Sequence, residues 1–237
     1  MITFVAPRLA RVRIYHYVRP IIKLLQMKQI KIKGKRVYKK TLVNNILNAF
    51  NNSTKANKEE GFGWYEMAYR HAEKMSQYNG LPTFQNVGII AALSPLSSWE
   101  RNKETALLYA QGQRKGLHTN KMIEKCAKIK ETRSFDEVLE ILNGDKIKSF
   151  AYNILKFGSF CPVTTIDRHA ISVAYGKRIS DKDRPTLTTK QYQFISDAYV
   201  EATRIIRKNT QVDFLLPQEL QAITWVWFRI HGDTMHK

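Results

Sequence analysis

The chain has 237 residues, of which 43% are hydrophobic, a content that excludes an intrinsically disordered protein and allows one large or two small domains. Lys and Arg number 39 against 20 Asp and Glu, so the formal net charge of +19 favours a polyanionic partner. Only Cys126 and Cys161 occur, without a CxxC motif, which excludes a disulfide scaffold and a cysteine zinc site and fits a reducing, cytoplasmic compartment. No apolar run approaches the length of a membrane span, so we expect no membrane partner.

The positive charge is concentrated at the start of the chain. The first 58 residues hold fourteen Lys or Arg and no Asp or Glu. With interleaved tyrosines, this block predicts a basic arm for a polyanion, with nucleic acid first and an anionic membrane surface second. Residues 1–26 also have the composition of an organellar presequence, and Met27 is an alternative start. Residues 28–40 predict either a short hairpin or a disordered arm, and residues 51–61 a linker. We therefore divide the chain into a basic N-terminal arm, 1–60, and a domain, 61–237.

From Phe62 onward the pattern is helical. Before that point, Thr41 is expected to cap a helix over residues 42–50. The most apolar run, 87–93, predicts a buried helix over 83–93 that ends at a break beginning with Ser94 and Pro95. Further helices are expected over residues 64–79, 102–109, 121–130, 135–142 and 192–207, and from Pro217 onward. The fold class predicted from this pattern is all-α.

Residues 142–174 carry the pattern on which a functional prediction depends. Gly144 tolerates a positive φ, so Asn143-Gly144 predicts the end of one helix and a tight hairpin, after which Asp145 is expected to cap the next helix. A hairpin of this kind leaves backbone N–H groups free to bind a phosphate. Further along, Asp167 and His169 stand at the start of another helix.

This arrangement resembles the helix-hairpin-helix DNA glycosylases of the endonuclease III type, in which a hairpin precedes a V-D-T-H-like segment with a catalytic Asp. Two other segments are similar to the same superfamily: GIIAALSPLSSWERNKETALLYAQG to its apolar helix, L-S break and N-K-A helix, and ELQAITWVWFRIHG to its late helix. The three matches span residues 62–232 in order, and the chain also looks like uncharacterised phage-encoded glycosylase-like proteins. The resemblance implies a two-lobed fold with a basic N-terminal extension. The family's iron–sulfur cysteines are missing, so we expect no cluster, no other cofactor and no metal.

The resemblance also implies roles for single residues. Asp167 matches the catalytic carboxylate, which would stabilise an oxocarbenium-like sugar or orient water; its alternative role is a helix N-cap. His169 matches the motif's histidine, which orients the loop or packs in the core. Lys146 and Lys148 lie near the lysine that forms a Schiff base in bifunctional members, although a gapless count places Ser149 there. We expect a monofunctional enzyme whose lysines contact phosphates.

Leu96 corresponds to the family's glutamine, which wedges into the duplex beside the flipped base, and an apolar wedge can fill the vacated stack. The residues expected to contact DNA are Gly144, Lys146, Lys148, Ser149, Ser94, Leu96, Ser97, Ser98, Asn102 and Arg168. The residues expected to stack on the base, each alternatively a core aromatic, are Trp64, Tyr65, Trp99 and Phe150.

The function predicted from the sequence is excision of a modified or mismatched base from double-stranded DNA by a monomeric, cytoplasmic protein, associated with the nucleoid or acting in an infected host cell. Two alternatives remain. One is a phage-type enzyme of the same fold that hypermodifies a flipped base without cutting the sugar bond. The other is a non-catalytic DNA-binding protein. The residues do not identify the base.

Overall fold

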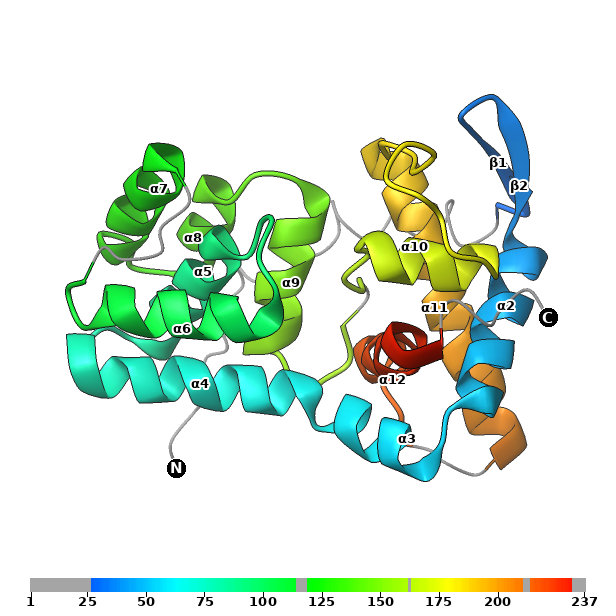
Figure 1. The fold of residues 1–237 in the computed structure, drawn as a ribbon, viewed down its shortest axis with the longest axis horizontal. Coiled ribbons are helices and arrows are strands. Elements are labelled where there is room, and N and C mark those ends of the chain that lie inside the picture. The colour runs from blue at the N-terminus through cyan, green and yellow to red at the C-terminus, as the bar shows by residue number, and fades with distance from the viewer. Residues whose placement is uncertain (1–26, 114–118, 162, 211–213, 232–237) are drawn as a thin grey trace, which may run out of the picture.

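The computed structural model describes residues 27–113, 119–161, 163–210 and 214–231, and most of them are helical. Figure 1 shows two lobes side by side, connected by the run from α3 (Lys55–Phe62) into α4 (Trp64–Asn79) and by the segment that follows α9. The expected all-α class is confirmed. Residues 1–26, the first part of the expected arm, lie outside the described residues.

One lobe, which we call the contiguous lobe, is built from residues 64–155. Its helices after α4 are α5 (Thr83–Leu93), α6 (Trp99–Ala110), α7 (Asn120–Lys130), α8 (Phe135–Ile141) and α9 (Asp145–Leu155). The central helix is α5, which contacts the other five and is buried from residue 85 to residue 93. Gly88 permits this packing, because a Cβ there would lie 2.5 Å from Val138 Cγ1.

The other lobe, which we call the terminal lobe, combines residues 27–62 with residues 163–231. It contains β1 (Gln29–Ile32), β2 (Lys35–Tyr38), α2 (Lys39–Asn52), α3, α10 (Arg168–Tyr175), α11 (Thr189–Thr210) and α12 (Pro217–His231). The central helix is α12, which contacts α2, α3, α10 and α11. Gly61 of α3 packs against α12 so closely that a Cβ there would lie 2.3 Å from Ile223 Cα.

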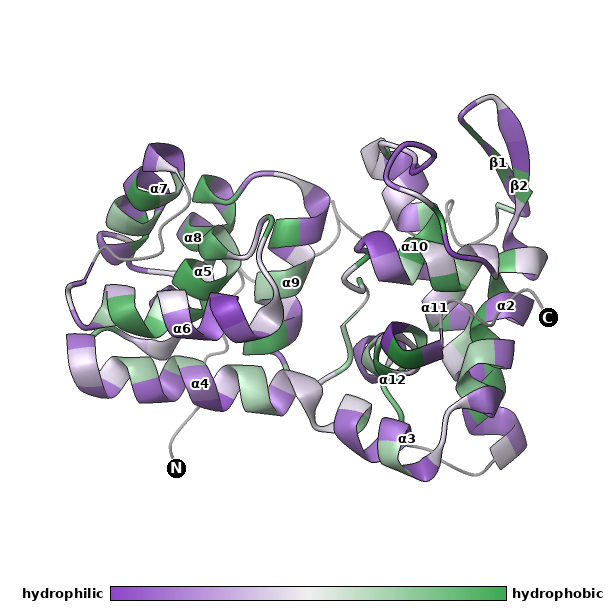
Figure 2. Cartoon of the chain, viewed as in Figure 1, coloured by the Kyte–Doolittle hydropathy of each residue, from purple (hydrophilic) through white to green (hydrophobic). Residues whose placement is uncertain are grey.

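Local sequence signals set where these helices begin and end. Ser98, Thr119 and Ser134 each accept a backbone N–H bond from three residues further on and so cap α6, α7 and α8. Gly80 and Gly176 follow α4 and α10 in left-handed conformation, which stops a helix at little steric cost. Apolar faces of the helices point into each lobe, whereas α4 and the β1–β2 hairpin present hydrophilic residues outward (Figure 2).

Residues 27–60 differ from the expected arm. The β1–β2 hairpin is confirmed, with Lys33 and Gly34 both at positive φ, as a tight type I′ turn requires. However, α2 buries Leu42 and Ile46 in the core of the terminal lobe, and α3 occupies most of the expected linker. A capping box between Thr54 and Asn57 starts α3 within this polar run, so no break in packing occurs at residue 60. No helix in the described ranges combines the length and apolar character needed to span a membrane.

Candidate functional site

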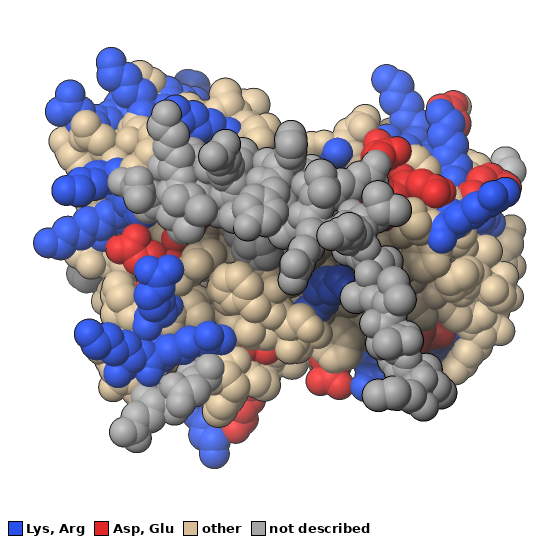
Figure 3. Space-filling model, turned by 180° about the vertical axis from the view of Figure 1, so that it is seen from behind, with Lys and Arg blue, Asp and Glu red and all other residues tan. Residues whose placement is uncertain are grey.

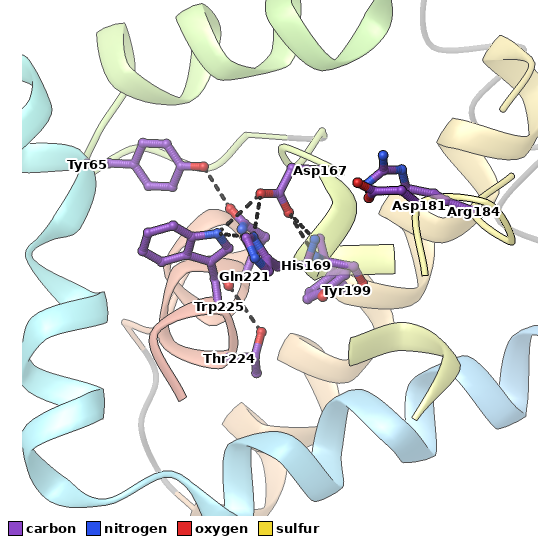
Figure 4. Close-up of polar contacts among 10 residues, drawn as sticks. Tyr65, Asp167, His169, Asp181, Arg184, Tyr199, Gln221, Thr224 and Trp225 are labelled. Atoms are coloured by element: carbon purple, nitrogen blue, oxygen red, sulfur yellow. Dashed lines mark hydrogen bonds and ion pairs between the residues drawn. The ribbon is translucent and has the colours of Figure 1, made fainter. Parts of the chain in front are cut away.

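The side chain of Asp167 lies at the start of α10, between the two lobes. Its Oδ1 caps the helix by accepting the backbone N–H groups of His169 (3.0 Å) and Ala170 (2.8 Å). Its Oδ2 lies 3.2 Å from the indole Nε1 of Trp225 and 3.3 Å from His169 Nδ1 (Figure 4). The capping role and a role in a site are therefore compatible, because each oxygen serves one of them.

Asp167 follows an extended segment, residues 163–166, whose backbone is hydrogen-bonded to buried side chains. The N–H of Thr164 bonds to Ser196 Oγ (2.9 Å), and the N–H of Ile166 bonds to Tyr192 Oη (2.8 Å). Thr165 Oγ1 donates to Asn153 Oδ1 (2.9 Å) on α9. The segment that positions the carboxylate is thus fixed to both lobes.

The electrostatic environment keeps Asp167 ionised. Burial alone would raise the pKa of its carboxyl group, but the hydrogen bond and charge of His169, the Ala170 N–H and the charge of Lys146 together hold that pKa below its ordinary value. The side chain is 20% exposed, so the carboxylate remains accessible to a ligand. A fixed, ionised and accessible carboxylate can stabilise positive charge that develops on a bound molecule.

A cavity of about 120 Å³ lies in front of Asp167, between the lobes. It is smaller than the roughly 300–1,000 Å³ of pockets for drug-sized ligands and suits a single small ring. The contiguous lobe contributes Trp64, Tyr65, Ser94, Ser97, Ser98, Trp99, Asn102, Lys146 and Phe150, and the remaining wall is formed by Thr165, Asp167, Gln221, Ala222 and Trp225. The structure thus brings together residues from all three of the segments on which the resemblance rests.

The walls of the cavity are rich in aromatic rings. The ring of Trp64 lies 4.8 Å from that of Trp99, 5.8 Å from that of Trp225 and 6.0 Å from that of Phe150, measured between centroids. Tyr65 is buried, and its hydroxyl lies 2.7 Å from Gln221 Oε1 and 3.0 Å from Thr165 Oγ1. The four aromatics expected from the sequence therefore all line the cavity.

Leu96 is not among the residues that line this cavity, but it lies in the break between Ser94 and Ser97, which do line it. Its side chain is 95% exposed, although a large apolar residue is normally buried. Its φ is +60°, a left-handed conformation that is strained for any residue with a Cβ other than Asn or Asp. Because residues held in such conformations cluster at functional sites, the break between α5 and α6 is set apart from an ordinary turn.

The two candidate lysines both lie on α9, just after its hairpin with α8, but only one of them lines the cavity. Gly144 has a φ of +82°, as expected, but it is itself the N-cap of α9 without a side-chain bond, so the expected capping role of Asp145 is wrong. Lys146 lines the cavity and interacts electrostatically with Asp167. Lys148 is exposed and does not line the cavity.

Three further expectations about DNA contacts can be placed. Ser149 is buried and hydrogen-bonded to Tyr192, and Asn102 is buried inside the contiguous lobe, so neither lies on a surface that DNA could touch from outside. Arg168 is exposed directly beside Asp167. Ser94, Ser97 and Ser98 lie along the cavity together, as one segment.

Sequence reasoning missed Thr165, Gln221 and Trp225. The last two lie one helical turn apart on α12 and share a face, because residues four positions apart in a helix point the same way. That spacing was available in the sequence, but nothing in it indicates that this face of α12 turns toward Asp167 and not into the core.

The surface of the terminal lobe is strongly basic. Residues 27–62 contain nine Lys or Arg and two Glu. Lys and Arg side chains predominate over this lobe when the molecule is seen from behind, with the hairpin at the upper left of the view (Figure 3). In the hairpin, Lys31 and Arg36 are directly opposed cross-strand partners and both are exposed. Like charges that are directly opposed repel each other and destabilise a hairpin, so the binding of an anionic partner would reduce this repulsion.

Comparison with known proteins gives one match. Residues 28–233 match a family described as "Family of unknown function (DUF7178)". No curated protein and no solved structure matches the chain.

Proposed function

The chain belongs to DUF7178, a family of unknown function, and we propose that it is a DNA N-glycosylase-like enzyme that acts on a base flipped out of the duplex. The observation that carries this proposal is the cavity between the lobes. It combines an ionised carboxylate, an amine and aromatic rings in a space suited to one small ring, and the strained, exposed Leu96 lies between two of its lining residues in the sequence, Ser94 and Ser97.

The proposed mechanism follows from what an N-glycosidic bond requires. An enzyme can reach a base only after the base has left the stack of the duplex. Leu96 would fill the space that the base vacates, and Trp64 and Trp99 would stack on the base inside the cavity. Positive charge develops on the sugar as the bond breaks, and Asp167 would stabilise that charge. Its donors fix the carboxylate in place before the reaction, so no reorganisation is needed at that moment.

In the proposed complex, the basic hairpin binds the phosphates of the DNA. Lys31 and Arg36 would each neutralise a phosphate, and the start of α9, with Lys146 and Lys148 in its first turn, would bind another. The double variant Lys31→Gln/Arg36→Gln should reduce the slope of log affinity against log salt by about 1.8, since each phosphate contact contributes about 0.9. An unchanged slope for duplex DNA would exclude the hairpin from the interface.

A second candidate, modification of the flipped base without cleavage of the sugar bond, is favoured by one specific observation. Oδ1 of Asp167 has two backbone donors and Oδ2 faces the indole N–H of Trp225, so three of the roughly four acceptor positions of the carboxylate are occupied. His169 Nδ1 lies 3.3 Å from Oδ2 and also 3.1 Å from the same indole nitrogen. Hydrolysis needs a group that orients or deprotonates water, and a carboxylate whose acceptor positions are mostly occupied is less suited to that part of the reaction than to charge stabilisation.

The test is mass spectrometry of DNA that carries a panel of modified and mismatched bases. Release of free base identifies a glycosylase, a changed base in an intact strand identifies a modifying enzyme, and no change identifies a DNA-binding protein. Asp167→Asn should lower turnover by about 100-fold or more, because it removes the charge and keeps the cap. Asp145→Asn is the matched control: it also removes one carboxylate near the DNA, and its turnover should stay unchanged.

Borohydride trapping separates the monofunctional from the bifunctional form of the proposal. Lys146 is the lysine beside Asp167, whereas Lys148 is its neighbour outside the cavity. A covalent complex that is lost in Lys146→Ala and kept in Lys148→Ala would assign a Schiff base to Lys146. Full activity of Asp167→Asn on an identified substrate would refute the proposed site.

A further inference from the structure

Gln221 on α12 has an amide group whose oxygen is held by the protein and whose nitrogen is not. Its Oε1 lies 2.7 Å from Tyr65 Oη, a separation typical of an O–H···O bond, whereas N–H···O bonds are mostly longer. Tyr65 has one hydroxyl proton, and the shorter of its two contacts takes it. The amide oxygen therefore faces Tyr65, which leaves the amide nitrogen for another partner. Figure 4 shows Gln221 in the same group of residues as Asp167 and Trp225.

The amide nitrogen, Nε2, is an unpaired donor that a ligand can reach. It makes no hydrogen bond within the described ranges. The unpaired side-chain atoms that the described part of the chain closes off from water are Gln85 Oε1, Asn102 Oδ1, Asp197 Oδ2 and Gln218 Oε1. Gln221 Nε2 is not one of them, so its surface remains accessible. Because Gln221 is otherwise buried, at 5% exposure, and lines the cavity, a ligand in the cavity is in a position to accept this N–H.

The contiguous lobe adds a second donor and a surface for stacking. Lys146 on α9 lines the cavity, and an ammonium group donates hydrogen bonds without accepting any. The rings of Trp64 and Trp99, whose centroids are 4.8 Å apart, form an aromatic wall. The cavity thus combines flat aromatic faces with N–H donors from both lobes. A ring that matches it must be flat and must carry an acceptor, for which a carbonyl oxygen is the usual group on a base.

We propose that Gln221 Nε2 donates a hydrogen bond to a carbonyl oxygen of the flipped base, and that this base is a single-ring pyrimidine. The inference rests on the proposed function and names its substrate class together with the residue that recognises it. The pyrimidines of DNA carry a carbonyl group, whereas adenine has none. Guanine has a carbonyl but two rings, and the cavity volume of about 120 Å³ favours one ring.

Binding of two small probes to the full chain tests this proposal without any need for catalysis. The first is 1-methylthymine, in which the N-methyl group stands for the sugar. The second is 2,4-difluoro-1,5-dimethylbenzene, which has the same shape but carries fluorine, a poor acceptor, in place of both carbonyl oxygens. Three tryptophans line the cavity, so intrinsic fluorescence reports binding. Gln221→Met should weaken the binding of 1-methylthymine about tenfold, because one hydrogen bond is lost, and should leave the affinity for the difluoro probe unchanged.

Gln218 provides the matched control for Gln221. It is also a buried amide on α12, one helical turn earlier, and its Nε2 donates to Ser159 O (2.7 Å), but it does not line the cavity. Both Gln218→Met and Gln221→Met should lower the melting temperature, because each removes a buried hydrogen bond. Only Gln221→Met should change the relative affinity for the two probes.

A third probe, 9-methyladenine, decides the question even if Gln221→Met does not fold. It has two rings and no carbonyl, so the unaltered chain should bind it about tenfold or more weakly than 1-methylthymine. Equal affinity for these two bases, no binding of 1-methylthymine, or a Gln221→Met variant that changes the affinity for both pyrimidine-shaped probes alike would overturn the proposal. Failure of the proposed function would instead appear as unchanged DNA in the mass-spectrometric test while the dependence of base binding on Gln221 persists.

Discussion

The two lobes differ in what they bury. The contiguous lobe encloses neutral polar side chains, among them Gln85, Asn86 and Asn102, whereas all three charged residues that are buried in the described part of the chain lie in the terminal lobe. Those three are Lys39, Asp197 and Glu219. Lys39 and Asp197 form an ion pair at 3.8 Å, and burial is the main cause that raises the pKa of Asp197.

The two lobes therefore contribute different features to the cavity and to the pH dependence of stability. The contiguous lobe supplies the aromatic wall and the strained leucine. Burial lowers the pKa of His71 on α4, so the stability of this lobe should fall at acidic pH, but the lobe buries no charged side chain in its described part and should respond little to pH above neutrality. The terminal lobe supplies Asp167 and carries the buried charges. Burial of a carboxyl group does not by itself decide its state: the pKa of Asp197 is raised, whereas the donors around Asp167 lower the pKa of that group. The hydrogen bonds and charges around Asp167 outweigh the effect of its burial, whereas burial outweighs them at Asp197.

The largest effect should come from a glycine in each lobe. Gly61→Ala places a Cβ against backbone atoms of Ile223, which cannot move without displacing α12, so we expect a loss of about 3 kcal/mol or more in unfolding free energy. Gly88→Ala meets Val138 Cγ1, a side-chain atom that can rotate away, and should cost about 1–2 kcal/mol. Urea denaturation followed by circular dichroism measures both.

Equal losses in the two variants would mean that α12 adapts as easily as a side chain does. A second unfolding transition in Gly61→Ala alone would show that the contiguous lobe stays folded without its partner. Either result would contradict the view that the two lobes depend on each other for stability and that the packing of α12 is rigid.

A smaller effect is expected from Glu219. Burial raises the pKa of its carboxyl group to about 7, although the N–H of Leu216 and the charge of Arg207 oppose the shift. A raised pKa means that the folded protein binds this proton more tightly than the unfolded chain does. Its contribution to stability is therefore present below pH 4.5 and is lost as pH rises to 7.

Glu219→Gln removes this titration and keeps an acceptor for Leu216 N–H. The difference in unfolding free energy between pH 4.5 and pH 8 should shrink by about 2 kcal/mol in the variant. The same scan with Gln85→Glu would move a buried charge into the contiguous lobe and should make that lobe pH-sensitive. No change in pH dependence for Glu219→Gln would contradict the assignment of pH sensitivity to the terminal lobe.

The smallest effect on stability should come from Leu96. Leu96→Asn replaces a residue that is strained at positive φ with one that tolerates it, and the leucine side chain contributes almost no burial. We expect unfolding free energy to rise by about 1 kcal/mol while base flipping weakens. The melting temperature and the fluorescence of 2-aminopurine beside the target base measure the two outcomes. A fall in both would assign Leu96 a structural role.

The sequence predicted the helices well where local signals exist. The helix over 83–93, the end of α4 before Gly80 and the start of α8 at Phe135 are found where they were expected, because apolar spacing, glycine and the Ser134 cap act within one turn. The boundary at residue 60 failed for the opposite reason. Composition marked residues 27–60 as an arm, but α2 is buried by α10, α11 and α12, which lie far away in the chain.

The candidate site divides in the same way. Asp167 and the four aromatics carry signals in their own neighbourhoods, and all of them line the cavity. The choice between Lys146 and Lys148 depends on the rotation of α9, and the burial of Ser149 depends on Tyr192 of α11. Such facts come from tertiary packing, and residue spacing along one helix cannot supply them.

The division of the terminal lobe between two distant parts of the sequence has a consequence for the order of events during synthesis. The contiguous lobe can fold as soon as α9 leaves the ribosome, because all its helices are then present. The helix α2 is made earlier but must wait for α12 before it can bury Leu42 and Ile46. The wall that carries Gln221 and Trp225 is translated after the other residues that line the cavity, so the cavity in front of Asp167 closes only once α12 has been made. A nascent chain therefore exposes its basic hairpin long before the cavity between the lobes has formed.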